Sequence, residues 1–388
     1  MTRWRGTGPA PAVVSGSGIY IHLPYCVSRC EYCSFVVSTD DSSRDSYLAA
    51  LEGESALVAG ETQGAAFDTV YFGGGTPSRI PLADLARLHA ALARHFRLLP
   101  GAEVTLEANP DDVARVPVAA WKEAGVNRVS LGVQSFSDRE LAAVGRRHDA
   151  RAARSALETL LAAGLSVSGD LILGLPEQTP DTFARSAQEL AGSGVDHVSV
   201  YLLETEKSRT IEEDRRLRPE RYLSDDAQAD LWLELSGTLA RAGLAHYEIS
   251  NWARPGREAR HNLKYWRREP TLGLGVSAHE LWDGRRRANV SALAVYIESI
   301  GKGKRPTALD QPIGAEAAAR EKLMLGLRLS DGVPRSELET FVAGSPDSRL
   351  RGDYQAWREE GVLEERDGRV LFSERGFLLS NEVLCRFV

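Results

Sequence analysis

The sequence predicts an α/β protein, with an incomplete (β/α)6 barrel followed by a C-terminal, mostly helical, winged-helix-like domain. Six short runs rich in β-branched residues follow one another, and the segments between them place apolar residues at helical spacing. The chain has 388 residues, more than the roughly 150 of a typical single domain. Six β/α units rather than eight indicate a barrel that is open on one side.

The six predicted strands cover residues 18–23, 68–72, 103–107, 128–133, 167–173 and 197–201. Alternating strands and helices form parallel sheets with right-handed crossovers. Five of these strands run into a glycine, a proline or a polar residue, at Pro24, Gly73–Gly75, Asn109–Pro110, Gln134 and Gly174–Pro176. Because the carboxyl ends of parallel strands carry the chemistry of α/β proteins, we expect these segments to meet at one mouth.

The chain divides by composition into four predicted parts. Residues 1–17 are rich in glycine, proline, serine and alanine and form a predicted flexible tail, and residues 18–240 form the partial barrel. Residues 241–310, mainly helices and loops, extend the barrel, and residues 311–388 form the C-terminal domain. In that domain a helix at 315–327 and two shorter helical stretches precede a hairpin, marked by Asp367-Gly368 between apolar runs.

Composition excludes several classes of protein. The 47 basic and 54 acidic residues give a net charge of −7, which argues against a nucleic-acid binder, and no basic recognition helix stands out in the C-terminal domain. No apolar run approaches the roughly 20 residues of a membrane span, and the first residues lack the apolar core of a secretory signal. We therefore expect a cytoplasmic protein, with at most peripheral contact at the inner face of a membrane.

Three of the four cysteines lie within eight residues, directly after the first predicted strand. Cys26, Cys30 and Cys33 have the spacing C-x3-C-x2-C, and three thiolates can hold three corners of a [4Fe–4S] cluster. Cys385 is far away in sequence, so one iron would stay open for an exchangeable ligand. A structural zinc site with His22 as fourth ligand is the alternative, and a disulfide would leave one cysteine unpaired.

The segment YIHLPYCVSRCEYC at 20–33 resembles the signature of radical S-adenosylmethionine (SAM) proteins. More narrowly, it is similar to the branch that contains oxygen-independent coproporphyrinogen III oxidases and heme chaperones. Four further blocks extend the resemblance in order along the chain: YFGGGTPS at 71–78, LEANP at 106–110, SLGVQSF at 130–136 and GDLILGLP at 169–176. Together these blocks are far more specific than any one of them.

The resemblance implies that SAM chelates the open iron through its amino and carboxylate groups. The positions that match SAM-contacting residues of the family are Tyr20, Gly74, Gly75, Thr76, Glu107, Gln134, Arg146 and Asp170, and Leu202 matches a position beside the adenine. A carboxylate suits the ammonium or the ribose hydroxyls, and an arginine suits the carboxylate. Glycine backbone can approach the methionine end closely, where a side chain would collide.

Two departures separate the two activities of this branch. Phe35 stands where the oxidase pattern has a fourth cysteine, and only 17 residues precede the first strand. The segment HNLKYW at 261–266 matches the HNxxYW motif of the heme chaperones. There His261 is a potential heme ligand, Tyr265 and Trp266 offer flat apolar area, and Lys264, Arg267 and Arg268 offer charge for the propionates. His279 is a second heme-ligand candidate, and the competing interpretation is a buried structural histidine with aromatics that only pack.

The sequence therefore favours a heme chaperone that carries a [4Fe–4S] cluster, SAM and heme and delivers heme to acceptor proteins such as respiratory enzymes. The second hypothesis is a radical SAM enzyme that acts on a tetrapyrrole, in the manner of coproporphyrinogen III dehydrogenase. The protein would then be an oxidoreductase, in which the protein orients the substrate and excludes water. The third is a structural zinc protein.

Overall fold

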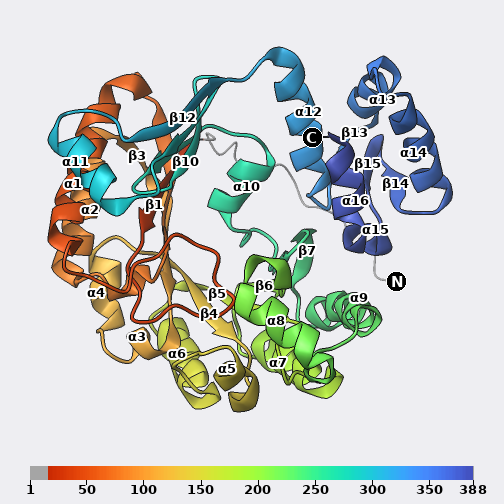
Figure 1. Ribbon diagram of the computed structural model, residues 1–388, viewed down its shortest axis with the longest axis horizontal. Coiled ribbons are helices and arrows are strands. Elements are labelled where there is room, and N and C mark those ends of the chain that lie inside the picture. The colour runs from red at the N-terminus through yellow and green to blue at the C-terminus, as the bar shows by residue number, and fades with distance from the viewer. Residues whose placement is uncertain (1–15, 388) are drawn as a thin grey trace.

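The computed structural model describes residues 16–387 of the chain (Figure 1). The predicted flexible tail, residues 1–17, lies outside this range except for its last two residues. Of these, Ser17 is already the first residue of strand β1 (Ser17–Leu23).

Six parallel strands form the centre of the fold, and all six lie where the sequence predicts them. Their order in the sheet is their order in the chain: β1, β2 (Ala66–Gly74), β3 (Arg97–Ala108), β4 (Arg128–Gln134), β5 (Ser166–Leu173) and β6 (His197–Leu202). The helices in the crossovers are α1 (Arg44–Ala59), α2 (Leu82–His95), α3 (Pro110–Val113), α4 (Val118–Glu123), α5 (Asp138–Ala143), α6 (Ala150–Ala162) and α7 (Pro180–Gly192). This is the predicted incomplete (β/α)6 barrel.

Short strands extend this sheet at both edges, and all but the last of them lie within residues 206–305, where the sequence predicts helices and loops. Beside β1 lie β9 (Thr271–Leu274), which is parallel to it, and then the antiparallel strands β10 (His279–Trp282), β11 (Arg285–Asn289) and β12 (Thr307–Pro312). Beside β6 lie β8 (Asn251–Ala253) and β7 (Ala245–Glu248). The sheet has twelve strands, and the prediction of helices and loops for this region is wrong at these strands.

Four helices connect these added strands: α8 (Arg209–Leu217), α9 (Asp225–Arg241), α10 (Arg260–Trp266) and α11 (Leu293–Gly301). Helix α10 carries the HNxxYW motif and contacts β1 and β2. The motif is therefore packed against the first two strands of the barrel, although it lies almost two hundred residues further along the chain.

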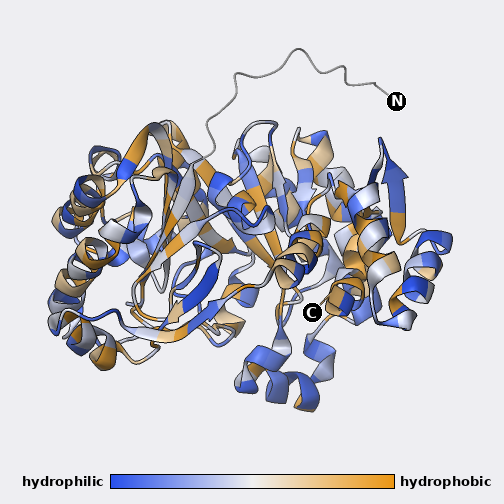
Figure 2. Ribbon diagram, turned by 90° about the horizontal axis from the view of Figure 1, so that it is seen from above, coloured by the Kyte–Doolittle hydropathy of each residue, from blue (hydrophilic) through white to orange (hydrophobic). Residues whose placement is uncertain are grey.

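Apolar side chains of the strands fill the space between the sheet and the outer helices. Ile19, Val70, Leu106 and Val129, one from each of the first four strands, are fully or almost fully buried. Figure 2 shows hydrophobic colouring along the sheet and mixed colouring on the helices around it, as expected for helices with one buried face. No helix within residues 16–387 combines the length and the apolar character needed to cross a membrane.

The C-terminal domain is a mostly helical unit with a small sheet. Its elements are α12 (Ala315–Leu327), β13 (Val333–Pro334), α13 (Arg335–Gly344), α14 (Ser348–Glu359), β14 (Leu363–Arg366), β15 (Arg369–Phe372), α15 (Glu374–Leu378) and α16 (Ser380–Leu384). The predicted hairpin is confirmed, because β14 pairs antiparallel with β15 and both turn residues, Asp367 and Gly368, have positive φ values of 51° and 74°. In Figure 1 this domain lies beside α10 and β7.

Candidate functional site

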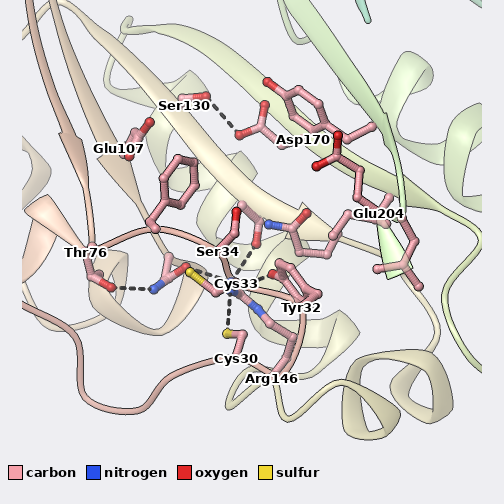
Figure 3. Close-up of a pocket in the computed structure, with 18 of the residues that line it drawn as sticks. Cys30, Tyr32, Cys33, Ser34, Thr76, Glu107, Ser130, Arg146, Asp170 and Glu204 are labelled. Carbon is pink, nitrogen blue, oxygen red and sulfur yellow. Dashed lines mark hydrogen bonds between the residues drawn. The ribbon is translucent and has the colours of Figure 1, made fainter. Parts of the chain in front are cut away.

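A cavity of about 740 Å³ opens at the carboxyl ends of the parallel strands, where the sequence places the chemistry. Its lining includes ten of the predicted site residues: Cys26, Cys30, Cys33, Gly74, Gly75, Thr76, Glu107, Gln134, Arg146 and Asp170. Figure 3 shows how Cys30, Cys33, Thr76, Glu107, Arg146 and Asp170 surround it. The predicted residues Tyr20, His261, Tyr265 and Trp266 are not among the lining residues.

The cysteine loop, residues 24–38, is fastened to the strand ends by backbone hydrogen bonds. The amide of Cys26 donates to the carbonyl of Ser38, and the amide of Thr76 donates to the carbonyl of Tyr25. The Thr76 hydroxyl also donates to the sulfur of Cys26, at 3.4 Å. Burial raises the pKa of the Cys26 and Cys33 thiols. The negative charges of the neighbouring cysteines raise both pKa values further. The three sulfurs therefore act on one another as a group.

The glycine-rich turn after β2 is packed against this loop. Gly74 has φ = +115°, and a Cβ there would lie 2.6 Å from the ring of His22. A Cβ on Gly75 would lie 2.6 Å from the carbonyl carbon of Pro24 and 3.0 Å from the sulfur of Cys26. The glycines are thus required by contacts within the protein itself, and this turn holds the backbone directly beside the first cysteine.

A chain of hydrogen bonds connects Cys30 with Cys26 through Arg146 and Asn109. Arg146 Nη1 donates to the sulfur of Cys30 at 3.5 Å, and its Nη2 donates to Asn109 Oδ1 at 2.6 Å. Asn109 Nδ2 donates to the hydroxyl of Thr76, which itself donates to Cys26. The sequence predicts only that Asn109 lies at the end of a strand. Its position, a polar residue before a proline at a strand end, is the signal that could have identified it as a site residue.

The zinc site with His22 does not match the contacts within residues 16–387. Within the part of the chain that the structure describes, no group of three or more His, Cys, Asp or Glu residues is arranged to hold one metal ion. In a [4Fe–4S] cube each thiolate binds a different iron, so its ligands stand further apart than those of one ion. His22, the fourth ligand of the zinc alternative, uses both ring nitrogens elsewhere, with Tyr20 at 3.0 Å and the Val36 carbonyl at 2.8 Å. That alternative is not supported.

Two carboxyl groups lie on the strand floor of the cavity. Burial raises the pKa of Glu107 to about 7 and that of Asp170 to about 6. Glu107 accepts hydrogen bonds from the Tyr71 hydroxyl at 2.8 Å and from the Gly74 amide at 2.9 Å. Asp170 accepts one from Ser130 at 2.9 Å. Such groups are well suited to accept hydrogen bonds from ligand hydroxyl or ammonium groups.

Two of the predicted site residues that line the cavity have buried polar atoms without a partner. Gln134 has φ = +65° at the irregular end of β4, and its Oε1 is buried without a hydrogen bond, as is Nε of Arg146. Buried polar atoms are normally paired, so these two atoms indicate a missing ligand. The donor set, the raised carboxyl groups and these orphaned atoms together fit a polar, partly charged cofactor beside the cysteines.

His261 lies behind this cavity and is fully bonded inside the protein. It is 1% exposed, its Nδ1 pairs with Thr69 Oγ1 at 2.8 Å, and its Nε2 pairs with the Tyr265 hydroxyl at 2.9 Å. Its ring stacks on Tyr71, with the centroids 5.2 Å apart, and Tyr20 lies in the same aromatic group. Burial, followed by the charge of Lys264, lowers the pKa of His261 to about 3, so the imidazole is neutral. These contacts match those expected for a buried structural histidine.

Lys264 on α10 and Arg268, two residues after this helix, also have charged partners within the protein. Lys264 is buried and contacts Asp68 at 2.7 Å, Glu269 at 3.1 Å and the carbonyl of Gly16 at 2.6 Å. Arg268 pairs with Glu321 at 2.6 Å. The expectation that Lys264 and Arg268 are available for propionates is therefore wrong. His279, in contrast, is exposed on β10.

The fold and the cysteine-lined cavity together define a radical SAM protein. The model of the Radical SAM superfamily matches residues 20–204, and the model of the HemN C-terminal domain matches residues 313–379. Coproporphyrinogen III oxidase (HemN) from Escherichia coli, a radical SAM enzyme, has the same fold, with a TM-score of 0.80 over 96% of this chain and 90% of that one, at 22% identity.

Relatives in sequence define the family more closely. The heme chaperone HemW of Mycobacterium tuberculosis is 36% identical over 97% of this chain and 96% of its own length. The heme chaperone HemW of Bacillus subtilis is 32% identical over 95% of this chain and 98% of its own length. The chain belongs to the HemW family of the radical SAM superfamily, and that superfamily implies a [4Fe–4S] cluster and SAM.

Proposed function

We propose that the protein is a heme chaperone that binds heme and transfers it to acceptor proteins such as respiratory enzymes. Its membership of the HemW family, in which the relatives from Mycobacterium tuberculosis, Bacillus subtilis and Lactococcus lactis are named heme chaperones, is the observation that carries this proposal. Phe35, in place of a fourth cysteine in the loop, favours it over the oxidase. An acceptor at a membrane requires only peripheral contact of the chaperone with that surface.

Cys26, Cys30 and Cys33 are the proposed ligands of the [4Fe–4S] cluster, with SAM at the open iron. When bound, the cluster supplies one electron at a time. Arg146 and Thr76 donate to two of the sulfurs and so stabilise their charged form. Glu107, Asp170 and Gln134 provide polar contacts for SAM, and Gly74 and Gly75 bring backbone beside it. Tyr20 forms a hydrogen bond with His22.

His261, Tyr265 and Trp266 remain the proposed heme segment. A neutral imidazole is the form that binds iron, and the depressed pKa of His261 keeps it in that form. Its Nε2 bonds to Tyr265, a residue with 36% of its surface exposed, so displacement of this one hydroxyl opens the ring to a ligand. His279, exposed on β10, is the alternative ligand.

Heme titration of the anaerobically reconstituted protein tests the proposal. We expect a Soret band that saturates with added heme, and its loss or shift in His261→Ala but not in His279→Ala. His261→Gln serves as the matched control for folding, because its amide can still bond to Thr69. Absence of heme binding by the unmutated protein contradicts the proposal, and an effect of His279→Ala alone moves the ligand to β10.

A second candidate is a radical SAM enzyme that acts on a tetrapyrrole. The cavity favours it, because two carboxyl groups with raised pKa values and orphaned polar atoms line the same cavity as the cysteines. Production of 5′-deoxyadenosine that depends on an added porphyrinogen selects this candidate. Production that is unaffected by porphyrinogens selects the chaperone.

A further inference from the structure

Arg328 lines the same cavity as the three cysteines. It directly follows α12, and its neighbours in the lining are Phe377, Leu378 and Asn381 of the C-terminal domain. The other lining arginines, at 29, 79, 146 and 147, all come from the cysteine loop and the first half of the barrel. Arg328 is therefore the cation that the C-terminal domain contributes to this cavity.

The guanidinium of Arg328 is held in place but poorly neutralised. It lies over the ring of Trp266, 4.2 Å from the centroid, a cation–π contact that fixes its plane. Its nearest carboxylate oxygen, Glu248 Oε2, is 3.9 Å from Nη2. Across residues 16–387 the structure records no hydrogen bond from this guanidinium, and its Nε is buried without a partner. Burial lowers the pKa of Arg328, which shows that its surroundings compensate its charge incompletely.

Glu248 does not complete the neutralisation, because its other oxygen is already used. Oε1 accepts from the amide of Ser250 at 3.0 Å and from the side chain of Asn251. Glu248 Oε2 has no hydrogen-bond partner either. An arginine that stacks on an indole and leaves its fork of donors open is arranged to receive a planar anion.

The surroundings indicate which anion fits. Trp232, Phe377 and Leu378 also line the cavity and give it apolar walls, and Tyr201 and Leu202 line it with 44% and 48% of their surfaces exposed. A ligand that fits here combines a large apolar body with a carboxylate at its edge. A tetrapyrrole with propionate side chains has this chemistry.

We propose that Arg328, seated on Trp266, binds a carboxylate of the tetrapyrrole at the boundary between the barrel and the C-terminal domain. This inference rests on the proposed function. It gives Arg328 the role predicted for Lys264 and Arg268, which pair with Asp68 and Glu321. It also assigns the C-terminal domain a direct part in ligand binding, because α12 places this arginine.

Binding of heme and of its dimethyl ester, measured by absorbance titration, tests the inference. The ester keeps the ring and the iron but has no free carboxylate. We expect the unmutated, cluster-loaded protein to bind heme at least about tenfold more tightly than the ester, a difference of about 1.4 kcal/mol. Arg328→Gln weakens heme binding about tenfold and leaves ester binding unchanged.

Two further variants serve as controls. Arg320→Gln removes the same charge from a residue on α12 that does not line the cavity, and it leaves the heme affinity unchanged. Arg328→Lys keeps the charge without the planar fork and gives an intermediate affinity. If Arg328→Gln lowers the cluster content or the thermal stability, the lysine variant decides the question.

Heme affinity that is the same in Arg328→Gln and the unmutated protein overturns the inference, as does an equal loss of heme and ester binding. In both cases the proposed function survives, because the unmutated protein still binds heme. If the unmutated protein binds neither compound, the proposed function fails and the assignment of Arg328 fails with it.

Discussion

The cysteine cavity and the α10 segment are both marked by sequence motifs, but they differ in how their polar groups are paired. Around the cavity, Gln134 and Arg146 have buried polar atoms without partners. On α10, both ring nitrogens of His261 are bonded and Lys264 has three partners, although Nε1 of Trp266 is buried without a partner. Saturated polar groups stabilise a fold, whereas open ones next to a cavity are available to a ligand.

This difference indicates that the two motifs have different roles in the protein without a ligand. The cavity beside the cysteine loop has polar atoms that a ligand can bind without breaking a bond within the protein. The α10 segment packs against β1 and β2 of the barrel. Heme binding at His261 therefore requires the hydrogen bond between Tyr265 and His261 to break. Substitutions in the two regions are therefore expected to have different consequences.

The largest effect is expected in the cavity, from Cys26→Ala. Loss of one of three thiolates leaves two corners of the cube without sufficient ligation, and the cluster content falls to near zero. Iron and sulfide analysis after anaerobic reconstitution measures it, and thermal unfolding of the metal-free protein should change little. Retention of a full cluster contradicts the assignment of these three cysteines.

In the closed region, Lys264→Met is expected to act on stability. It leaves Asp68 as a buried carboxylate with Arg260, at 2.9 Å, and the backbone of Gly16 as its remaining partners. Breaking a buried ion pair in this way typically costs about 3–5 kcal/mol in free energy of unfolding. Denaturant unfolding measures the loss, and Lys304→Met, at a residue that is exposed, is the control. A loss below about 1 kcal/mol means that the ion pair of Lys264 with Asp68 does not stabilise the fold as a buried pair.

The two regions are expected to respond oppositely to pH. The folded-state pKa of Glu107, about 7, lies above its unfolded value, so its contribution to stability is present below about pH 4 and is lost as pH rises to 7. The folded-state pKa of His261, about 3, lies below its unfolded value of about 6.5, so stability is lost as pH falls from 6.5 to 3.

The variants Glu107→Gln and His261→Gln separate these contributions. The first should flatten the fall in unfolding free energy between about pH 4 and 7, and the second should flatten the loss on acidification below pH 6.5. Each effect is at most about 1.4 kcal/mol per pH unit. Unfolding free energies at several pH values measure it, and parallel profiles for both variants and the unmutated protein refute the pKa assignments.

A smaller effect is expected from Asn109→Ala, which interrupts the hydrogen-bond chain between Cys30 and Cys26. Arg146 and Thr76 each lose one partner, a loss of about 1–2 kcal/mol in stability. The cluster should still form but with an altered reduction potential, because hydrogen bonds to the sulfurs set that potential. Asn109→Asp, which keeps the acceptor for Arg146, restores part of the change. An unaltered potential in Asn109→Ala removes Asn109 from the site.

The smallest effect is expected from Cys385→Ser. Cys385 is exposed near the end of the C-terminal domain and donates only to the carbonyl of Glu382. The cluster content, heme binding and stability should equal those of the unmutated protein. A loss of iron in this variant would show that a fourth cysteine reaches the cluster.

The parallel strands and the cysteine site were predictable because their signals are local. Five of the six strands run into a glycine, a proline or a polar residue, and the three cysteines lie within eight consecutive residues. Asp367-Gly368 identified the hairpin for the same reason, since its turn needs two residues that accept positive φ.

The remaining features depend on contacts between distant segments. Strand β11 reads as three consecutive arginines, and Arg285 and Arg287 find Asp310 on β12 only once the chain is folded. Lys264 looks like a free surface charge until Asp68, on another strand, is placed beside it. The position of Arg328 on the cavity wall likewise depends on how α12 packs against α10.

The most direct test of the account is electron paramagnetic resonance of the reduced, anaerobically reconstituted protein, titrated with SAM. The account predicts the spectrum of a [4Fe–4S] cluster that changes as SAM binds the open iron, and no such change in Gln134→Ala at the same SAM concentration. A spectrum indifferent to SAM, or a protein that carries zinc instead of iron and sulfide, would contradict the central claim that three cysteines hold a cluster with one open position.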